Sequence, residues 1–227
     1  MKICIGIISY LPEANDDRGK VIRFRRIGKI VNLINQCNNI FGGIPILIVA
    51  QNWKREINLS NNCTAWLYDK PLGITGARRK LRNYFINSDF DYMIMLDDDC
   101  ELVGTADNGK FYLQQLLDNP GKYGVFADTL LKLFAISKEM YKKIDYPEDI
   151  EAEKGEYLED IYITLMLKNL YPDKEFRIVT NGLYDISDSA GDNNSTWSND
   201  NIDRKEMGAR TRKLVEEKVK ELKNEQA

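Results

Sequence analysis

The sequence predicts an α/β fold, in which a central, mostly parallel sheet is flanked by helices and followed by a helical tail. Two observations support this class. Strand-length apolar segments alternate with segments of helical periodicity over the first 180 residues or so, and the chain ends in a charged amphipathic segment. Alternation of this kind is typical of parallel strands joined by helical crossovers.

The first half of the chain contains four expected strands and two expected helices. Residues 3–9 form a β-branched run that ends in the turn 9–12, and residues 23–37 then carry Phe24, Ile27, Ile30, Val31 and Ile34 at helical spacing. Gly42 and Gly43 end this helix. Residues 44–49 and 64–68 are the second and third strands, residues 76–86 the second helix, and residues 91–96 the fourth strand.

The second half continues the alternation. Residues 111–117 and 138–144 are expected as helices, with a strand at 132–136 between them. An acidic cluster at 145–160 precedes an apolar-periodic helix at 161–170, and a strand at 176–180 closes the sheet. The segment 187–201 is rich in Ser, Asp, Asn and Gly and is expected to be a loop. The helix at 204–226 has one apolar side, which is expected to pack on the domain; the alternative is a dimer or partner contact.

Composition limits the function classes. With 227 residues, 43% hydrophobic and 30% charged, the chain suits one sizeable domain with a helical appendage. The net charge of −3 argues against a protein that mainly coats nucleic acid, although Arg18 to Lys29 form a basic run. Histidine is absent, so acid–base chemistry falls to Asp, Glu, Lys, Tyr or Cys.

Cysteine usage and hydropathy bear on location. The four cysteines are far apart and have no Cys-x-x-Cys spacing, which disfavours a disulfide framework or a zinc site. No apolar segment approaches the roughly 20 residues that a membrane-spanning helix needs, and no secretory signal is recognised. We expect a cytoplasmic protein with reduced thiols and no membrane insertion.

Asp97, Asp98 and Asp99 directly follow the apolar strand 91–96. Adjacent carboxylates repel one another, and at a strand end they are tolerated mainly when a cation or several donors neutralise them. In an extended segment Asp97 and Asp99 would lie on the same side, which suits a divalent metal. The alternative is a solvated turn, in which Asp is common.

Four motifs together resemble those of a known family. They are Gly73 to Arg79 ahead of a helix, Met95 to Asp99 at a strand end, Phe134 to Lys138, and Tyr157 to Leu167. In this order they resemble the glycosyltransferases of the GT-A fold, closest to family 2, over roughly residues 1–185. The resemblance implies a Rossmann-like fold and an enzyme that moves a sugar from a nucleotide-diphosphate sugar, with UDP favoured, to an acceptor hydroxyl.

The resemblance also implies a donor site. Asp97 would approach the nucleoside, Asp99 together with Asp97 would hold Mn²⁺ or Mg²⁺, and Asp98 would share either task. Arg78 matches an arginine suited to nucleotide or phosphate contacts, whereas Arg79 stands where the family has asparagine. Further expected donor contacts are Ser9, Tyr10, Gly73 and Gly76. The two glycines would permit close backbone approach to the nucleotide or only end a turn. Lys80 and Arg82 are expected on a solvated helix face.

Asp160 is the expected catalytic base, with Glu159 as its orienting partner, because they match the Glu-Asp at the start of a family helix. A carboxylate there would accept the proton of the acceptor hydroxyl during a single, inverting displacement. The competing interpretation is an acidic pair favoured by the helix dipole. The histidine that completes the metal shell in many such enzymes is missing, so an acid such as Asp185, Asp188 or Asp192, or water, would replace it. Trp197 would stack on a sugar or anchor its loop.

The expected division is a donor-binding half at 1–100, an acceptor-binding and catalytic half at 101–186, and a loop with a C-terminal helix at 187–227. The acceptor is a glycan, a protein side chain or a hydroxymethylated DNA base; the last follows from the basic run 18–29 together with basic residues of 204–213. Two other function classes stay open: a Mg²⁺-dependent nucleotidyltransferase and a non-catalytic nucleotide-binding module.

Overall fold

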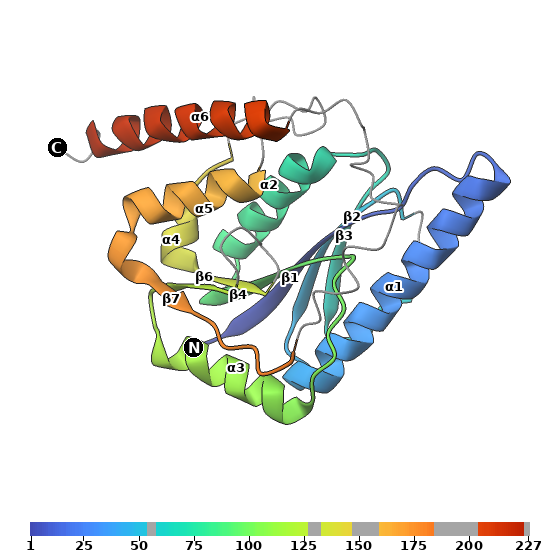
Figure 1. The fold of residues 1–227 in the computed structure, drawn as a ribbon. Helices are drawn as coiled ribbons and strands as arrows, with labels where there is room; N and C mark the ends of the chain where they lie inside the picture. The colour runs from blue at the N-terminus through green and yellow to red at the C-terminus, as the bar shows by residue number, and fades with distance from the viewer. Residues whose placement is uncertain (54–57, 127–132, 147–158, 184–203, 225–227) are drawn as a thin grey trace.

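The computed structural model of the protein describes residues 1–53, 58–126, 133–146, 159–183 and 204–224, without the side chains of residues 159, 204 and 205. A seven-stranded, mostly parallel sheet in the order β3-β2-β1-β4-β6-β5-β7 forms its centre, with helices on both faces (Figure 1). The α/β, Rossmann-like class predicted from the sequence is confirmed, as is the C-terminal helix.

Strand pairing places β1 in the middle of the parallel part. Strands β1 to β4 run parallel, and β6 pairs antiparallel with both β4 and β5. Strand β7 runs parallel to β5 at the edge. The strands are β1 (Ile3–Tyr10), β2 (Ile46–Gln51), β3 (Cys63–Tyr68), β4 (Tyr92–Asp97), β5 (Tyr123–Val125), β6 (Phe134–Ser137) and β7 (Glu175–Arg177).

Two groups of helices cover the two faces of the sheet, as Figure 1 shows. Helices α1 (Asp17–Phe41) and α3 (Ala106–Asp118) lie on one face. On the other face lie α2 (Gly73–Ile86), α4 (Lys138–Lys142), α5 (Glu159–Leu170) and α6 (Arg204–Asn224), with the short 3-10 helix η2 (Pro172–Lys174) after α5. None of the helices described is long and apolar enough to cross a membrane.

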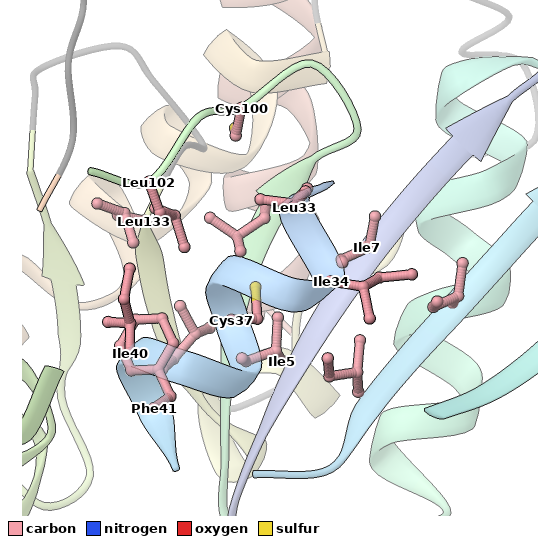
Figure 2. Close-up of a cluster of buried hydrophobic side chains, with 14 of the residues drawn as sticks. Ile5, Ile7, Leu33, Ile34, Cys37, Ile40, Phe41, Cys100, Leu102 and Leu133 are labelled. Carbon is pink, nitrogen blue, oxygen red and sulfur yellow. The ribbon is translucent and has the colours of Figure 1, made fainter. Parts of the chain in front are cut away.

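Alternation along each central strand builds a separate core on each face. Ile5 and Ile7 of β1 point to the α1 side, where Leu33, Ile34 and Cys37 of α1 pack on them (Figure 2). Met93 and Met95 of β4 point to the opposite side, toward α2, α4 and α5. Because residue parity decides the face, the same alternation determines where the polar residues at the strand ends point.

Helix α1 differs from the prediction in length and in orientation. It begins at residue 17, where Asp16 caps it by accepting the backbone N–H of Gly19 at 2.6 Å, and it runs to residue 41. Phe24, expected to be buried, is 78% exposed, and Val31 is 37% exposed. The true buried stripe includes Arg23, because its guanidinium finds backbone carbonyl acceptors inside the fold.

Other differences are smaller. Strand β5 was not expected, since its three residues carry too little pattern; it pairs with both β6 and β7. Helix α3 begins at residue 106 behind a capping box at Thr105 and Asn108, five residues before the predicted start. Helix α6 packs on α5 through Val215 and Val219, both under 10% exposed, so the expected packing role of the tail is confirmed.

Candidate active site

The predicted site lies where the strand order reverses. After β1 the chain adds β2 and then β3 on one side, whereas β4 pairs with the other side of β1. Ile8 of β1 is in register with Asp97 of β4, so Ser9, Tyr10 and the Asp run all emerge at the carboxyl ends of two adjacent parallel strands. In open α/β sheets, ligands bind in the crevice at such a switch point.

Asp97 and Asp98 point to opposite faces of the sheet. Asp97 has the parity of Met93 and Met95 and lies on the α2 side, where it accepts a hydrogen bond from Arg78. Asp98 contacts the α1 side. Strand β4 ends at Asp97, and residues 98 and 99 form a turn, so the extended geometry needed to align Asp97 with Asp99 does not continue past the first carboxylate.

The Asp98 carboxylate is the centre of a polar cluster. Its Oδ2 accepts the Ser9 hydroxyl at 2.9 Å and the Tyr10 backbone N–H at 3.2 Å, and Arg26 Nη1 lies 3.7 Å away. Trp53 Nε1 donates to Ser9 Oγ at 3.1 Å. Burial raises the pKa of Asp98 to about 6, although Arg26 and the Ser9 hydroxyl act in the opposite direction. The cluster therefore ties the ends of β1, β2 and β4 together.

Arg78 links the Asp run to the predicted base. Its side chain is 2% exposed, and Nη2 donates to Asp97 Oδ1 at 2.7 Å. Burial raises the pKa of Asp160, which also accepts the Ile161 backbone N–H at 2.7 Å; Arg78 lowers that pKa and Asp97 raises it. Asp97, Arg78 and Asp160 thus interact electrostatically on one side of the sheet.

Asp99 is exposed at the mouth of this crevice. Among the described residues no three His, Cys, Asp or Glu side chains are grouped so as to hold a metal ion. Mg²⁺ in nucleotide sites is held by one or two carboxylates together with substrate phosphates, so a three-carboxylate cage is not required. Asp99 is exposed, whereas the side chain of Asp97 is 28% exposed.

The start of α2 forms a further wall of the site. Gly73, the first residue of α2, adopts φ +70°, a conformation that other residues rarely adopt and that turns the chain into the helix. A Cβ on Gly76 would lie 3.2 Å from the Cβ of Leu72, a tight contact that would require Leu72 to shift by a few tenths of an ångström. The Leu72 backbone N–H donates to Gln51 Oε1 at 2.6 Å, which holds the start of α2 against the end of β2.

Two arginines of α2 reach the end of α4 and the residues that follow it. Arg79 Nε donates to Tyr146 O at 3.0 Å, and Arg82 donates to Tyr141 O at 2.9 Å and to Lys142 O at 2.8 Å. The expectation that Arg82 is solvated is wrong, since it is 7% exposed and finds acceptors inside the fold. Lys80 is exposed, as expected.

Some predicted residues lie outside the described part of the chain. These are the Glu159 side chain, Asp185, Asp188, Asp192 and Trp197. Within the basic run, Arg23 is buried and Arg26 is drawn toward Asp98, whereas Arg18, Arg25 and Lys29 stay exposed.

Sequence reasoning missed Arg26 and Trp53 as members of the site. Arg26 belonged to a basic run with no periodic signal to separate inward from outward members. Trp53 follows the second strand by two residues, and its position at a strand end was the signal that pointed to the crevice.

Comparisons with known proteins agree with this fold. No protein-family model and no curated sequence matches the chain. Among solved structures, S. aureus TarS with UDP aligns at a TM-score of 0.56 and 10% identity, over 81% of this chain and 59% of that chain. TarS with UDP-GlcNAc aligns at 0.54 and 10% identity, over 81% and 57%. A cytidylyltransferase of Leptospira borgpetersenii serovar Hardjo-bovis aligns at 0.50 and 12% identity, over 81% and 78%.

These likenesses establish a shared fold. The present chain spans between 36% and 59% of the TarS chains that it matches.

Proposed function

We propose that the protein is a glycosyltransferase that moves a sugar from a nucleotide-diphosphate sugar, with UDP as the favoured nucleotide, to an acceptor hydroxyl with inversion at the anomeric carbon. The observation that carries the proposal is the interaction of Asp97 with Arg78 and Asp160 beside the switch point between β1 and β4. The shared fold with TarS, whose structures hold UDP and UDP-GlcNAc, supports it.

Donor binding would occupy the carboxyl ends of β1 and β4. Ser9 and Tyr10, to which Asp98 is hydrogen-bonded, would contact the donor from the α1 side, and Asp97 from the α2 side, with Gly73 and Gly76 at the start of α2 as further contacts. Arg78 is held on Asp97 and is almost fully buried, so its first task is to orient that carboxylate for a ribose or phosphate contact. Residues 1–100 are then the donor half, and residues 101–186 the half that receives the acceptor.

Asp160 would accept the acceptor proton. A general base works best when its pKa approaches the working pH, and burial shifts the pKa of Asp160 in that direction. Arg78 acts in the opposite direction and favours the ionised carboxylate. Glu159, one residue earlier on α5, would orient it. With one base and no second nucleophile required, the displacement inverts the anomeric centre.

Asp99 and Asp97 would hold Mn²⁺ or Mg²⁺, and the cation would supply charge neutralisation for the departing nucleoside diphosphate. Acids of the segment 184–203, such as Asp185, Asp188 or Asp192, or water would complete its oxygen ligands. Trp197 belongs to the same segment and would contact the sugar or anchor the loop.

The acceptor class is a glycan, a protein side chain or a hydroxymethylated DNA base. Helices α1 and α6, which carry the two basic segments, cover opposite faces of the sheet, so a duplex would contact one of them at a time. Absence of duplex DNA binding at low salt would exclude the DNA acceptor, because phosphate-driven affinity is greatest there.

Donor turnover tests the proposal. UDP release from UDP-GlcNAc and other UDP-sugars with Mn²⁺ is expected in the wild type and is expected to fall at least about a hundredfold in Asp160→Asn when an acceptor is present. The matched control is Asp118→Asn, an exposed carboxylate on α3. Equal turnover in all three proteins would contradict the catalytic role of Asp160.

The second candidate is a Mg²⁺-dependent nucleotidyltransferase, which the likeness to the Leptospira cytidylyltransferase favours. It predicts pyrophosphate release from a sugar 1-phosphate and a nucleoside triphosphate, and no UDP release from UDP-sugars. A non-catalytic nucleotide-binding module, the third class, predicts nucleotide binding with neither product and no effect of Asp160→Asn.

A further inference from the structure

We propose that Arg82 and Tyr162 are positioning residues that hold Asp160 beside Arg78 and Asp97. The proposal rests on the proposed function for its catalytic consequence, while its structural part stands on contacts of the described residues alone. The link runs from α2 through the segment 141–146 to the first turn of α5.

Arg82 anchors the beginning of that segment. Its guanidinium donates to the carbonyl oxygens of Tyr141 and Lys142 at 2.9 and 2.8 Å, and its Cζ lies 6.0 Å from the centre of the Tyr141 ring. Arg82 Nη1 also lies 3.5 Å from Asp145 Oδ1. A buried arginine fixed by two carbonyls gives the backbone one defined position, because both acceptors must meet the same planar fork.

The end of the segment is held from two sides. Arg79 of α2 donates to Tyr146 O at 3.0 Å, and the Tyr162 hydroxyl of α5 donates to Asp145 O at 3.0 Å. The Tyr146 and Tyr162 rings pack with centroids 6.2 Å apart. The Tyr162 hydroxyl therefore joins α5 to residues 141–146, which arginines of α2 already hold.

Tyr162 is two residues from Asp160, and Arg78 is four residues from Arg82 on α2. The same helix that presents Arg78 to Asp97 thus also determines, through the 141–146 segment, where the first turn of α5 lies. Residues four apart lie on one face of a helix, so both arginines project toward the same side of the sheet. Loss of either anchor would let Asp160 move relative to Arg78 without removing any donor contact.

The test compares Tyr162→Phe with Tyr112→Phe. Both tyrosines are buried and donate to one backbone carbonyl, Tyr112 to Leu133 O at 2.7 Å, but Tyr112 lies on the opposite face of the sheet. Each variant keeps its ring, so both are expected to fold with similar losses of stability. Arg82→Lys, which keeps the charge but loses the planar fork, is the second test variant.

Hydrogen exchange and turnover are measured on all of them. Tyr162→Phe and Arg82→Lys are expected to speed exchange of the amides of residues 163–167 by about fivefold, the equivalent of one lost hydrogen bond, while Tyr112→Phe leaves those amides unchanged. UDP release from UDP-GlcNAc with Mn²⁺ is expected to lose about tenfold in kcat with the UDP Kd within about twofold, because positioning affects chemistry more than donor binding.

The two readouts separate the possible failures. If the wild type releases no UDP, the proposed function fails for this donor, and hydrogen exchange still decides the positioning link. If Tyr162→Phe and Tyr112→Phe have the same effect on exchange in α5, the link is overturned. Faster amide exchange in α5 together with a kcat equal to that of Tyr112→Phe would overturn the proposed effect on catalysis.

Discussion

Replacement of Arg78 by methionine tests the electrostatic centre of the site. The substitution removes the cation from the 2.7 Å pair with Asp97 and leaves Asp97 and Asp160 facing each other without it. Breaking a buried ion pair by deleting one partner costs about 3–5 kcal/mol. Because Asp97 is 28% exposed and water partly solvates it, we expect the lower end, about 3 kcal/mol.

For a protein of this size each kcal/mol corresponds to about 2–4 °C in Tm, so Arg78→Met is expected to lower Tm by roughly 6–12 °C. Urea unfolding at pH 7 in EDTA gives the free energy directly. Combining Arg78→Met with Asp97→Asn should cost less than the sum of the two by roughly 1–3 kcal/mol, since the partners interact directly. Lys80→Met, an exposed change on the same helix, is the control. A loss in Arg78→Met no larger than in Lys80→Met would refute the reasoning.

Three further predictions concern stability. Because burial raises the pKa of Asp98 from 3.8 to about 6, the stability gained from its protonation is fully present only below pH 3.8 and is lost as pH rises through 6; urea unfolding should show wild type gaining roughly 2 kcal/mol over Asp98→Asn between pH 7 and pH 4. A Cβ on Gly109 would lie 2.0 Å from a backbone oxygen of α1, so Gly109→Ala should lose about 2–3 kcal/mol in thermal unfolding, whereas Gly28→Ala, with nothing within 4 Å, should gain about 0.5–1 kcal/mol. Arg23→Met should lose about 2 kcal/mol by urea unfolding because two carbonyls lose their donor, and a loss equal to that of exposed Arg25→Met would contradict this.

Hydrophobic periodicity predicted the features that depend on the residues of a single strand or helix. The apolar run before Asp97 indicated a buried strand, and parity within that strand places Met95 and Asp97 on one face. The resemblance to GT-A glycosyltransferases placed Ser9 and Tyr10 with the Asp run in one predicted donor site, and the structure places the ends of β1 and β4 in register.

Hydrophobic periodicity could not predict which residues far apart in the sequence contact one another. The burial of Arg23 and Arg82 depends on carbonyl acceptors 11 to 60 residues away in the sequence, which no local window contains. The polar first turns of α1 hid its start at residue 17, where Asp16 caps the helix. The Asp98 cluster likewise depends on Trp53 and Arg26, contributed by two other segments.

The most direct test of the account is a thermal-shift panel of UDP, GDP, CDP and TDP, each with Mn²⁺, Mg²⁺ or EDTA. It compares the wild type, Asp99→Ala and Asp118→Ala. A ligand that binds only the native state raises Tm by mass action. The account predicts a metal-dependent rise with UDP in the wild type and in Asp118→Ala, and its loss in Asp99→Ala. No rise with any nucleotide, or an equal rise in all three proteins with EDTA, would contradict a metal-assisted nucleotide-sugar site at the carboxyl ends of β1 and β4.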